Sequence, residues 1–350
     1  MSTTVDTRQE TAGGPPRSSS RRLTERVFRI RESGIIVVLV VFVAITVSIQ
    51  PRFASQQEAQ FILANTTIFA LLALGETMVV VSRNVDLSIG LVVGLSAYLS
   101  ASLFGNVHGI PIVVVFLVGL AIGLAVGVAN GLMVAIGRVP SLVVTLATLY
   151  IVRGIDILIV GGNEVVAQTL PNAFIQIPRA GVYGIPYLAI VIAVVIGVGA
   201  YYLRSYRSGR ELYAIGSNPE AARLAGIHVG RRVFTAFAVS GAIAGVAGVL
   251  WAAQYQTVDS NAGTGYELTV IASVVVGGVA IFGGSGSAVG AAIGALLLQT
   301  INSALYVLGI SPFWDQAIAG ALLLAAITLD RIISLRLAAA LRRRSAGVGT

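Results

Sequence analysis

The stretch that decides the fold is IPIVVVFLVGLAIGLAVGVANGLMVAI, residues 110–136, which carries no charged side chain. The hydrocarbon core of a bilayer is about 30 Å thick, and a helix that rises about 1.5 Å per residue crosses it with roughly 20 apolar residues. Apolar side chains here do not alternate with polar ones as they do in a barrel strand. Because backbone groups inside a bilayer must bond internally, this stretch is predicted to cross the membrane as one helix.

The rest of the 350-residue chain has the same character. Of its residues 56% are hydrophobic and only 11% are charged, and the mean hydropathy is +0.89. Soluble domains carry about 25% charged residues, so this chain cannot cover a water-facing surface of its size. The predicted fold class is therefore all-α, a polytopic transmembrane helical bundle.

Nine further apolar segments accompany the first, giving a bundle of about ten spans. The bundle is predicted to occupy residues 32–334. The ten predicted spans are 34–49, 61–81, 87–104, 110–136, 141–160, 185–203, 233–253, 268–282, 288–308 and 313–329.

The basic residues predict how the spans are oriented. All 23 are Arg, and most lie in the tail 1–31, the loop 204–230 and the tail 335–350. Cytoplasmic segments are enriched in basic residues, so both termini and the loop 204–230 are predicted to be cytoplasmic. The chain is then a multi-pass protein of the cell inner membrane, with a disordered first tail. A basic tail before an apolar run is also typical of a secretory signal, but no convincing cleavage site follows residues 34–49.

Several function classes are excluded by what the sequence lacks. The net charge of +8 invites nucleic-acid binding, but the Arg residues gather in tails and one loop rather than on a folded surface. There is no Cys, and the two His residues lie far apart, so no metal site and no cofactor are predicted. Without Lys there is no Gly-Lys-Ser/Thr phosphate loop, so ATP hydrolysis by that route would need another subunit. No catalytic constellation is present, and the chain is not expected to be an enzyme.

Glycines recur at every fourth position in three segments of the chain. Small residues at this spacing let membrane helices approach closely, so these segments are predicted to be packing seams. They are Gly119, Gly123, Gly127 and Gly131, then Gly241 and Gly245, then Gly286, Gly290 and Gly294.

Ionisable residues at or near membrane depth form a second set of candidates. Each costs roughly 2.5–3.5 kcal/mol at mid-bilayer unless it is paired or wetted. Arg153 and Asp156 lie three residues apart on one helix face and are predicted to form an intramembrane ion pair. Structural pairing or capping is favoured over a proton relay for the others, which are Glu76, Asp86, Glu267 and Asp315. Asp86, Asn130 and Glu267 are kept as candidates for either a translocation path or structural polar contacts.

The loop 204–230 contains a short predicted helix. Asn218 suits the N-cap, Pro219 the first helical position, Glu220 the first turn and Gly226 the C-terminal cap. Its small apolar face would comprise Ala221, Ala222, Leu224 and Ala225, with Arg223 on the solvated face. A helix this short is not stable alone in water and should dock, either on its own bundle or on a partner.

Five ordered motifs between residues 53 and 331 carry a resemblance to a known family. The chain resembles the permease subunits of carbohydrate-uptake ABC transporters, the ribose, xylose, rhamnose and autoinducer-2 group, which is related to branched-chain amino-acid permeases. The motifs are Asp86-Leu87-Ser88-Ile89-Gly90, Asn130-Gly131 followed by Val139-Pro140-Ser141, Arg153-Gly154, the 209–227 segment, and Ala262 to Glu267 leading to Gly277-Gly278.

The resemblance implies partners and a role for the short helix. The partners are a cytoplasmic ABC ATPase, an extracytoplasmic sugar-binding protein and a second permease copy or paralogue. The helix Asn218–Gly226 would be the coupling helix, seated in a groove of the ATPase. The variant Ser82-Arg83-Asn84-Val85-Asp86, with Pro312-Phe313-Trp314-Asp315 and Ala319-Gly320, favours rhamnose or autoinducer-2 as substrate and leaves ribose and xylose open. The rival hypotheses are an ion-coupled secondary transporter, which would need mid-membrane ion ligands, and a membrane enzyme.

Overall fold

The computed structural model describes residues 19–311 and 313–346, with side chains for residues 33–311, 313–328 and 331–332. Ten of its helices coincide with the ten predicted spans, so the predicted all-α bundle is confirmed. They are α1 (Ser19–Ile49), α2 (Gln56–Val81), α3 (Ile89–Asn106), α4 (Ile112–Ala135), α5 (Ser141–Val160), α7 (Tyr187–Ser205), α10 (Val229–Tyr255), α11 (Tyr266–Val276), α12 (Ala288–Val307) and α13 (Trp314–Ala346).

Seven of these helices are both long and apolar enough to cross a membrane: α2, α3, α4, α5, α7, α10 and α12. The other three predicted spans correspond to the shorter apolar segments 33–49 of α1, α11 and 314–328 of α13. The tails differ from the prediction. Helix α1 already begins at Ser19 and α13 continues to Ala346, while residues 1–18 and 347–350 lie outside the described part of the chain.

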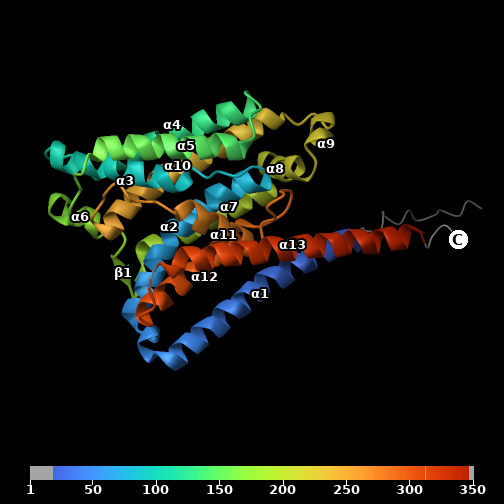
Figure 1. Cartoon of the computed structure of the whole chain (residues 1–350), viewed down its shortest axis with the longest axis horizontal. Coiled ribbons are helices and arrows are strands. Elements are labelled where there is room, and N and C mark those ends of the chain that lie inside the picture. Colours follow the sequence, from blue (N-terminus) through green and yellow to red (C-terminus); the bar gives the residue numbers. More distant parts are fainter. Residues whose placement is uncertain (1–18, 312, 347–350) are drawn as a thin grey trace, which may run out of the picture.

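The remaining elements are short and lie between the long helices. They are η1 (Pro51–Ala54), η2 (Ala167–Thr169), α6 (Asn172–Ile175), the antiparallel strands β1 (Gly181–Val182) and β2 (Ile185–Pro186), α8 (Arg207–Ser217) and α9 (Pro219–Leu224). Figure 1 shows α6 and β1 at one end of the bundle and α8 and α9 at the other. The beginning of α1 and the end of α13 are directed toward the α8–α9 end.

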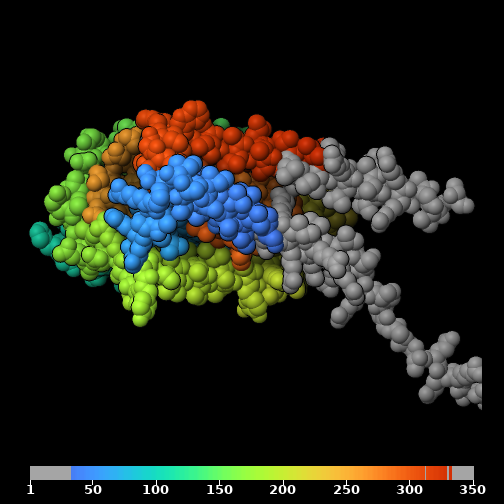
Figure 2. Space-filling model, turned by 90° about the horizontal axis from the view of Figure 1, so that it is seen from below, coloured from blue at the N-terminus to red at the C-terminus, as the bar shows by residue number. Residues whose placement is uncertain are grey.

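Helix α2 lies at the centre of the bundle. Almost every residue from Ala64 to Val81 is buried, as expected for a helix that is apolar on all sides. Figure 1 shows α4 and α5 along one edge of the bundle and α1 with α13 along the opposite edge. Seen from below in Figure 2, α1 lies across one face between α13 and α7. The outward sides of α4, α5 and α7 are apolar and exposed, as a lipid-facing surface requires.

The predicted glycine seams are confirmed for α4, α10 and α12. The α4 glycines pack directly on the α10 glycines: a Cβ added to Gly123 would lie 2.1 Å from the carbonyl oxygen of Gly241, and one added to Gly245 would lie 2.0 Å from that of Gly119. A Cβ added to Gly294 of α12 would likewise lie 2.1 Å from the carbonyl oxygen of Ser273 in α11. Gly286 is different, because it lies in the loop before α12 with a φ of +141° and joins no seam between helices.

Candidate functional site

The short helix predicted in the 204–230 loop forms as α9. The side-chain oxygen of Asn218 accepts hydrogen bonds from the backbone N–H of Glu220 and Ala221, each at 3.1 Å. Pro219 occupies the first turn, and Gly226 has a φ of +78° just beyond the helix end. These caps confirm the predicted boundaries, and they satisfy backbone groups that a six-residue helix could not satisfy internally.

The predicted apolar face of α9 is split by the structure. Ala222 is only 4% exposed and packs with Leu212, Ile215 and Val233 of its own bundle. Leu224 is 91% exposed, and Ala221 and Ala225 are exposed as well. The prediction of a single docked face is therefore corrected: Ala222 anchors α9 to this chain, while Leu224 is the large apolar group that α9 presents outward. Figure 1 shows α9 beside α8, at one end of the bundle.

Helix α8, which the sequence interpretation treated as loop, connects α9 to the bundle. Its buried side carries Leu212 and Ile215, and Gly216 lies so close to the end of α2 that a Cβ there would be 1.9 Å from the carbonyl oxygen of Val81. The hydroxyl of Tyr213 donates to the carbonyl of Gly286 at 3.1 Å. Burial raises the pKa of Tyr213 to about 12, so this hydroxyl stays a donor. Helix α8 therefore contacts both the end of α2 and the loop between α11 and α12.

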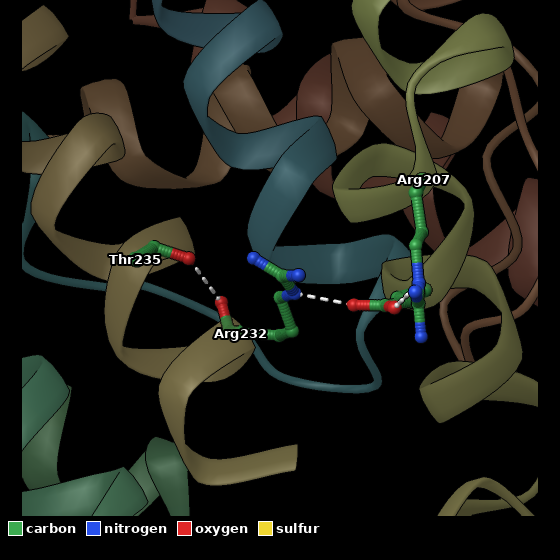
Figure 3. Close-up of polar contacts among 4 residues, drawn as sticks. Arg207, Arg232 and Thr235 are labelled. Atoms are coloured by element: carbon green, nitrogen blue, oxygen red, sulfur yellow. Dashed lines mark hydrogen bonds and ion pairs between the residues drawn. The ribbon is translucent and has the colours of Figure 1, made fainter. Parts of the chain in front are cut away.

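Glu211 ties α8 to α10, and Figure 3 labels its two partners, Arg207 and Arg232. Its two carboxylate oxygens accept from the Nε of Arg207 at 2.9 Å and from the Nε of Arg232, at the start of α10, at 2.5 Å. The Glu211 side chain is only 10% exposed. The hydrogen bond from Arg232 lowers the pKa of Glu211, and Arg207 adds to the same effect. In the sequence, the only indication of this ion-pair cluster is the four-residue spacing of Arg207 and Glu211.

We expect Glu211→Gln to destabilise the purified permease by about 1.5–3 kcal/mol, the range for a hydrogen bond to a charged partner. The matched control is Glu220→Gln, which removes the exposed pair with Arg223 on α9 and should change stability by no more than about 0.5 kcal/mol. The measurement is thermal unfolding in detergent. Because the folded pKa is lowered, the stabilisation is present above the unfolded pKa of about 4.3 and is lost as pH falls through the folded pKa. The gap between wild type and Glu211→Gln should therefore close in acid, and a gap independent of pH would contradict this assignment.

Two of the three candidate polar residues meet in a buried network. Asp86 accepts from the backbone N–H of Ser88 at 2.9 Å and from its hydroxyl at 2.6 Å, while Glu76 accepts from the backbone N–H of Asp86 at 3.1 Å. Asn130 of α4 donates to the Ser88 hydroxyl at 2.9 Å and accepts from Thr148 of α5 at 2.6 Å. The network fastens the turn between α2 and α3 to α4 and α5, which matches the structural role considered for Asp86 and Asn130.

Glu267 lies apart from these hydrogen bonds, in the first turn of α11. Its carboxylate rests against Gly90 in the first turn of α3, where an added Cβ would be 2.5 Å from one carboxylate oxygen. That oxygen has no hydrogen-bond partner. Glu267 therefore approaches α3 from α11 without joining Asp86 or Asn130.

The predicted ion pair between Arg153 and Asp156 is not formed in the described part of the chain. Arg153 instead donates to the carbonyl of Ser260 and to the side chains of Asn261 and Thr264, all in the loop between α10 and α11. Asp156 is buried, and neither of its carboxyl oxygens has a hydrogen-bond partner. The two residues are close on one helix face, but the guanidinium of Arg153 donates its hydrogen bonds to acceptors that are distant in the sequence.

Comparison with known proteins supports a transport role for this arrangement. Residues 59–327 match the family described as branched-chain amino acid transport system / permease component. The autoinducer 2 import system permease protein LsrC of Enterobacter sp. (strain 638) is 34% identical over 300 residues, 86% of each chain. The ribose import permease protein RbsC of Escherichia coli (strain K12) is 32% identical over 316 residues, covering 89% of this chain and 97% of the relative. No solved structure gives a significant match to the chain.

The match spans the bundle from α2 to α13, including α8, α9 and the buried network. The matched region contains helices that are long and apolar enough to cross a membrane, and the relatives that match it are import permeases. The chain therefore belongs to the branched-chain amino acid transport system / permease component family, and it is a membrane-spanning transport subunit rather than an enzyme.

Proposed function

We propose that this chain is the permease subunit of an ABC importer that takes up a monosaccharide or a sugar-like autoinducer. A cytoplasmic ATPase would drive it, an extracytoplasmic binding protein would deliver the substrate, and a second permease copy or paralogue would complete the membrane part. The observation that carries the proposal is α9, a capped helix at one end of the bundle that presents Leu224 outward. Contiguous exposed apolar surface marks an interaction site, and Leu224 with the exposed Ala221 and Ala225 supplies a small one on α9.

Two of the buried carboxyl groups, those of Glu76 and Asp86, support ATP coupling over ion coupling. Asp86 is bonded to Ser88, and Glu76 is bonded to the backbone of Asp86, so both act in fixing a turn. An ion-coupled carrier is expected to place ligands for its ion at broken helices near mid-membrane. Among the described residues no group of three or more His, Cys, Asp and Glu side chains could hold a metal ion.

Rhamnose or an autoinducer-2-like sugar is our favoured substrate, with ribose and xylose next. The support is the Ser82–Asp86 variant in the turn between α2 and α3, together with relatives that import autoinducer 2 and ribose. The test is uptake of labelled rhamnose, ribose, xylose and autoinducer 2 into vesicles that contain the permease, its ATPase and its binding protein. Uptake of one of them should require ATP and should persist when a protonophore collapses the proton gradient at constant ATP. Uptake that disappears with the protonophore would establish the secondary-transporter hypothesis instead.

We further propose that the α8–α9 end and both termini face the cytoplasm. The motivation is the concentration of Arg in the two tails and in the 204–230 loop, and both helix ends adjoining the tails are directed toward α8 and α9. The chain has no native Cys, so an introduced thiol gives a clean signal. An impermeant thiol reagent added to intact cells should label Glu164→Cys, in the exposed turn after α5, and should leave Ser217→Cys unlabelled until the cells are opened. The opposite pattern would invert the proposed orientation.

A further inference from the structure

Asp156 differs from every other buried acidic residue in the described part of the chain. Asp156 is 1% exposed, and both of its carboxyl oxygens are buried without a hydrogen-bond partner, whereas Glu76, Asp86 and Glu211 each accept at least one hydrogen bond. Buried polar groups are nearly always hydrogen-bonded, and an ionisable group within a membrane span is costly. Packing alone would favour an apolar residue at this position, so the carboxyl group calls for a functional explanation.

The nearest cation on the same helix face neither hydrogen-bonds to Asp156 nor forms an ion pair with it. Arg153 lies one turn before Asp156, yet its guanidinium donates to Ser260, Asn261 and Thr264. The same α10–α11 loop is fastened to the chain after α5 by two backbone hydrogen bonds between Val165 and Val258, at 3.0 and 2.9 Å. In this conformation Arg153 donates its hydrogen bonds to the loop, and Asp156 accepts no hydrogen bond from it.

The position of Asp156 suits a ligand that arrives from the α6–β1 end of the bundle. Val152, one turn before it on the same face of α5, packs with Leu91 and Leu95 of α3. The α10–α11 loop also touches α3, because a Cβ added to Gly94 would lie 2.0 Å from the carbonyl oxygen of Ala262. Helices α3 and α5 and this loop therefore meet at the half of the bundle that carries Asp156. In the proposed orientation that half is the outer one.

We propose that Asp156 is a substrate-binding residue that accepts hydrogen bonds from hydroxyl groups of the transported polyol. The subsite opens when the α10–α11 loop leaves Arg153. A carboxylate is an acceptor with two oxygens, and two neighbouring hydroxyls of a sugar are donors that match it. The released guanidinium of Arg153 then offers its donors to the ring or hydroxyl oxygens of the same molecule. This inference rests on the proposed function, and it adds the residue that recognises the substrate inside the membrane.

The test compares Asp156→Asn and Asp156→Leu with wild type in vesicles that contain the full transporter. Labelled rhamnose, ribose, xylose and autoinducer 2 are the probes, with leucine as a branched-chain amino acid. Both variants should accumulate and resist heating at least as well as wild type, because an unpaired buried carboxyl group is lost. The KM for the transported sugar should rise about tenfold or more, the effect of losing one hydrogen bond to a charged group. Glu164→Gln, which removes an exposed charge just after α5, is the matched control and should leave KM unchanged.

A second measurement does not depend on the KM values. Asp156→Cys should react with a water-soluble thiol reagent during turnover, and the transported sugar should slow that reaction. An unreactive thiol during turnover would overturn the inference, as would an unchanged KM in Asp156→Asn or a KM effect confined to leucine. Variants that accumulate poorly but transport normally per folded molecule would show that Asp156 is structural. Absence of uptake of every sugar by the wild type would instead overturn the proposed function, on which this inference depends.

Discussion

Leu224→Asp is expected to abolish ATP-driven uptake while leaving the permease folded in the membrane. Leu224 is 91% exposed at the end of α9, so the substitution removes no internal packing from this chain. On docking, a leucine side chain contributes about 1.5–3 kcal/mol by burial, whereas an unpaired carboxylate in the same groove would be strongly disfavoured. The combined loss corresponds to a weakening of ATPase binding by roughly a hundredfold or more. The measurements are retention of the ATPase by the tagged permease and sugar uptake in the same membranes.

Two control variants separate docking from folding in this experiment. Arg223→Ala removes an exposed side chain whose ion pair with Glu220 is solvated, and it should have a small effect on both measurements. Ala222→Arg places a cation in the contact of α9 with Leu212 and Val233, so it should reduce the amount of folded permease. If Leu224→Asp retains the ATPase and transports at the wild-type rate, α9 is a packing element of its own bundle and the coupling assignment is wrong.

The bundle could be predicted from the sequence because hydropathy is a property of each segment by itself. Ten apolar stretches gave ten helices, and most boundaries agree within a few residues. The largest discrepancy inside the bundle is the eighth span, which ends at Val276 rather than near 282. The chain leaves the helix at Gly277, and Gly278 has a φ of +98°, a conformation that a helix cannot continue. An apolar loop follows, and apolar composition alone cannot distinguish a loop from a helix.

The sequence did not predict helix α8, because hydropathy also fails to report the contacts that bury it. Two of its buried positions are Gly209 and Gly216, which add nothing to a hydropathy pattern. Their burial comes from close approach to the backbones of Tyr202 and Val81, a tertiary contact. The caps of α9, in contrast, involve neighbours within three residues and were predicted correctly.

The hydrogen-bond partners of the buried polar residues could not be predicted from spacing in the sequence. Arg153 and Asp156 are three positions apart, and the spacing permits an ion pair. One partner that Arg153 actually uses, Ser260, is 107 positions away in the sequence. Asn130 likewise meets Ser88 across 42 positions. The sequence identified which polar residues need partners, but only the fold determines which partners are in reach.

The glycine seam between α4 and α10 leads to the largest expected effect on folding. The four-residue spacing predicted close packing, and the structure adds that the two glycine rows face each other. At Gly123 an added Cβ would lie 2.1 Å from the carbonyl oxygen of Gly241 and 2.5 Å from the backbone nitrogen of Gly245. These contacts are with backbone atoms, so no side-chain rotation can relieve them. Between membrane helices no hydrophobic gain offsets the lost contact, because lipid is as apolar as the side chain.

We therefore expect Gly123→Leu to prevent accumulation of folded permease and Gly123→Ala to reduce it. Overpacking a well-packed core typically costs about 1–3 kcal/mol, and a clash with backbone along a whole seam should exceed that range. Marginally stable proteins tolerate only a few such losses. Gly197→Leu is the matched control, because Gly197 is an exposed glycine of α7 with no atom within 4 Å of an added Cβ. The amount of monodisperse permease extracted from membranes is the measurement. Normal yield of Gly123→Leu would mean that α4 and α10 are not held at this separation, and the assigned packing of the two glycine rows would then be wrong.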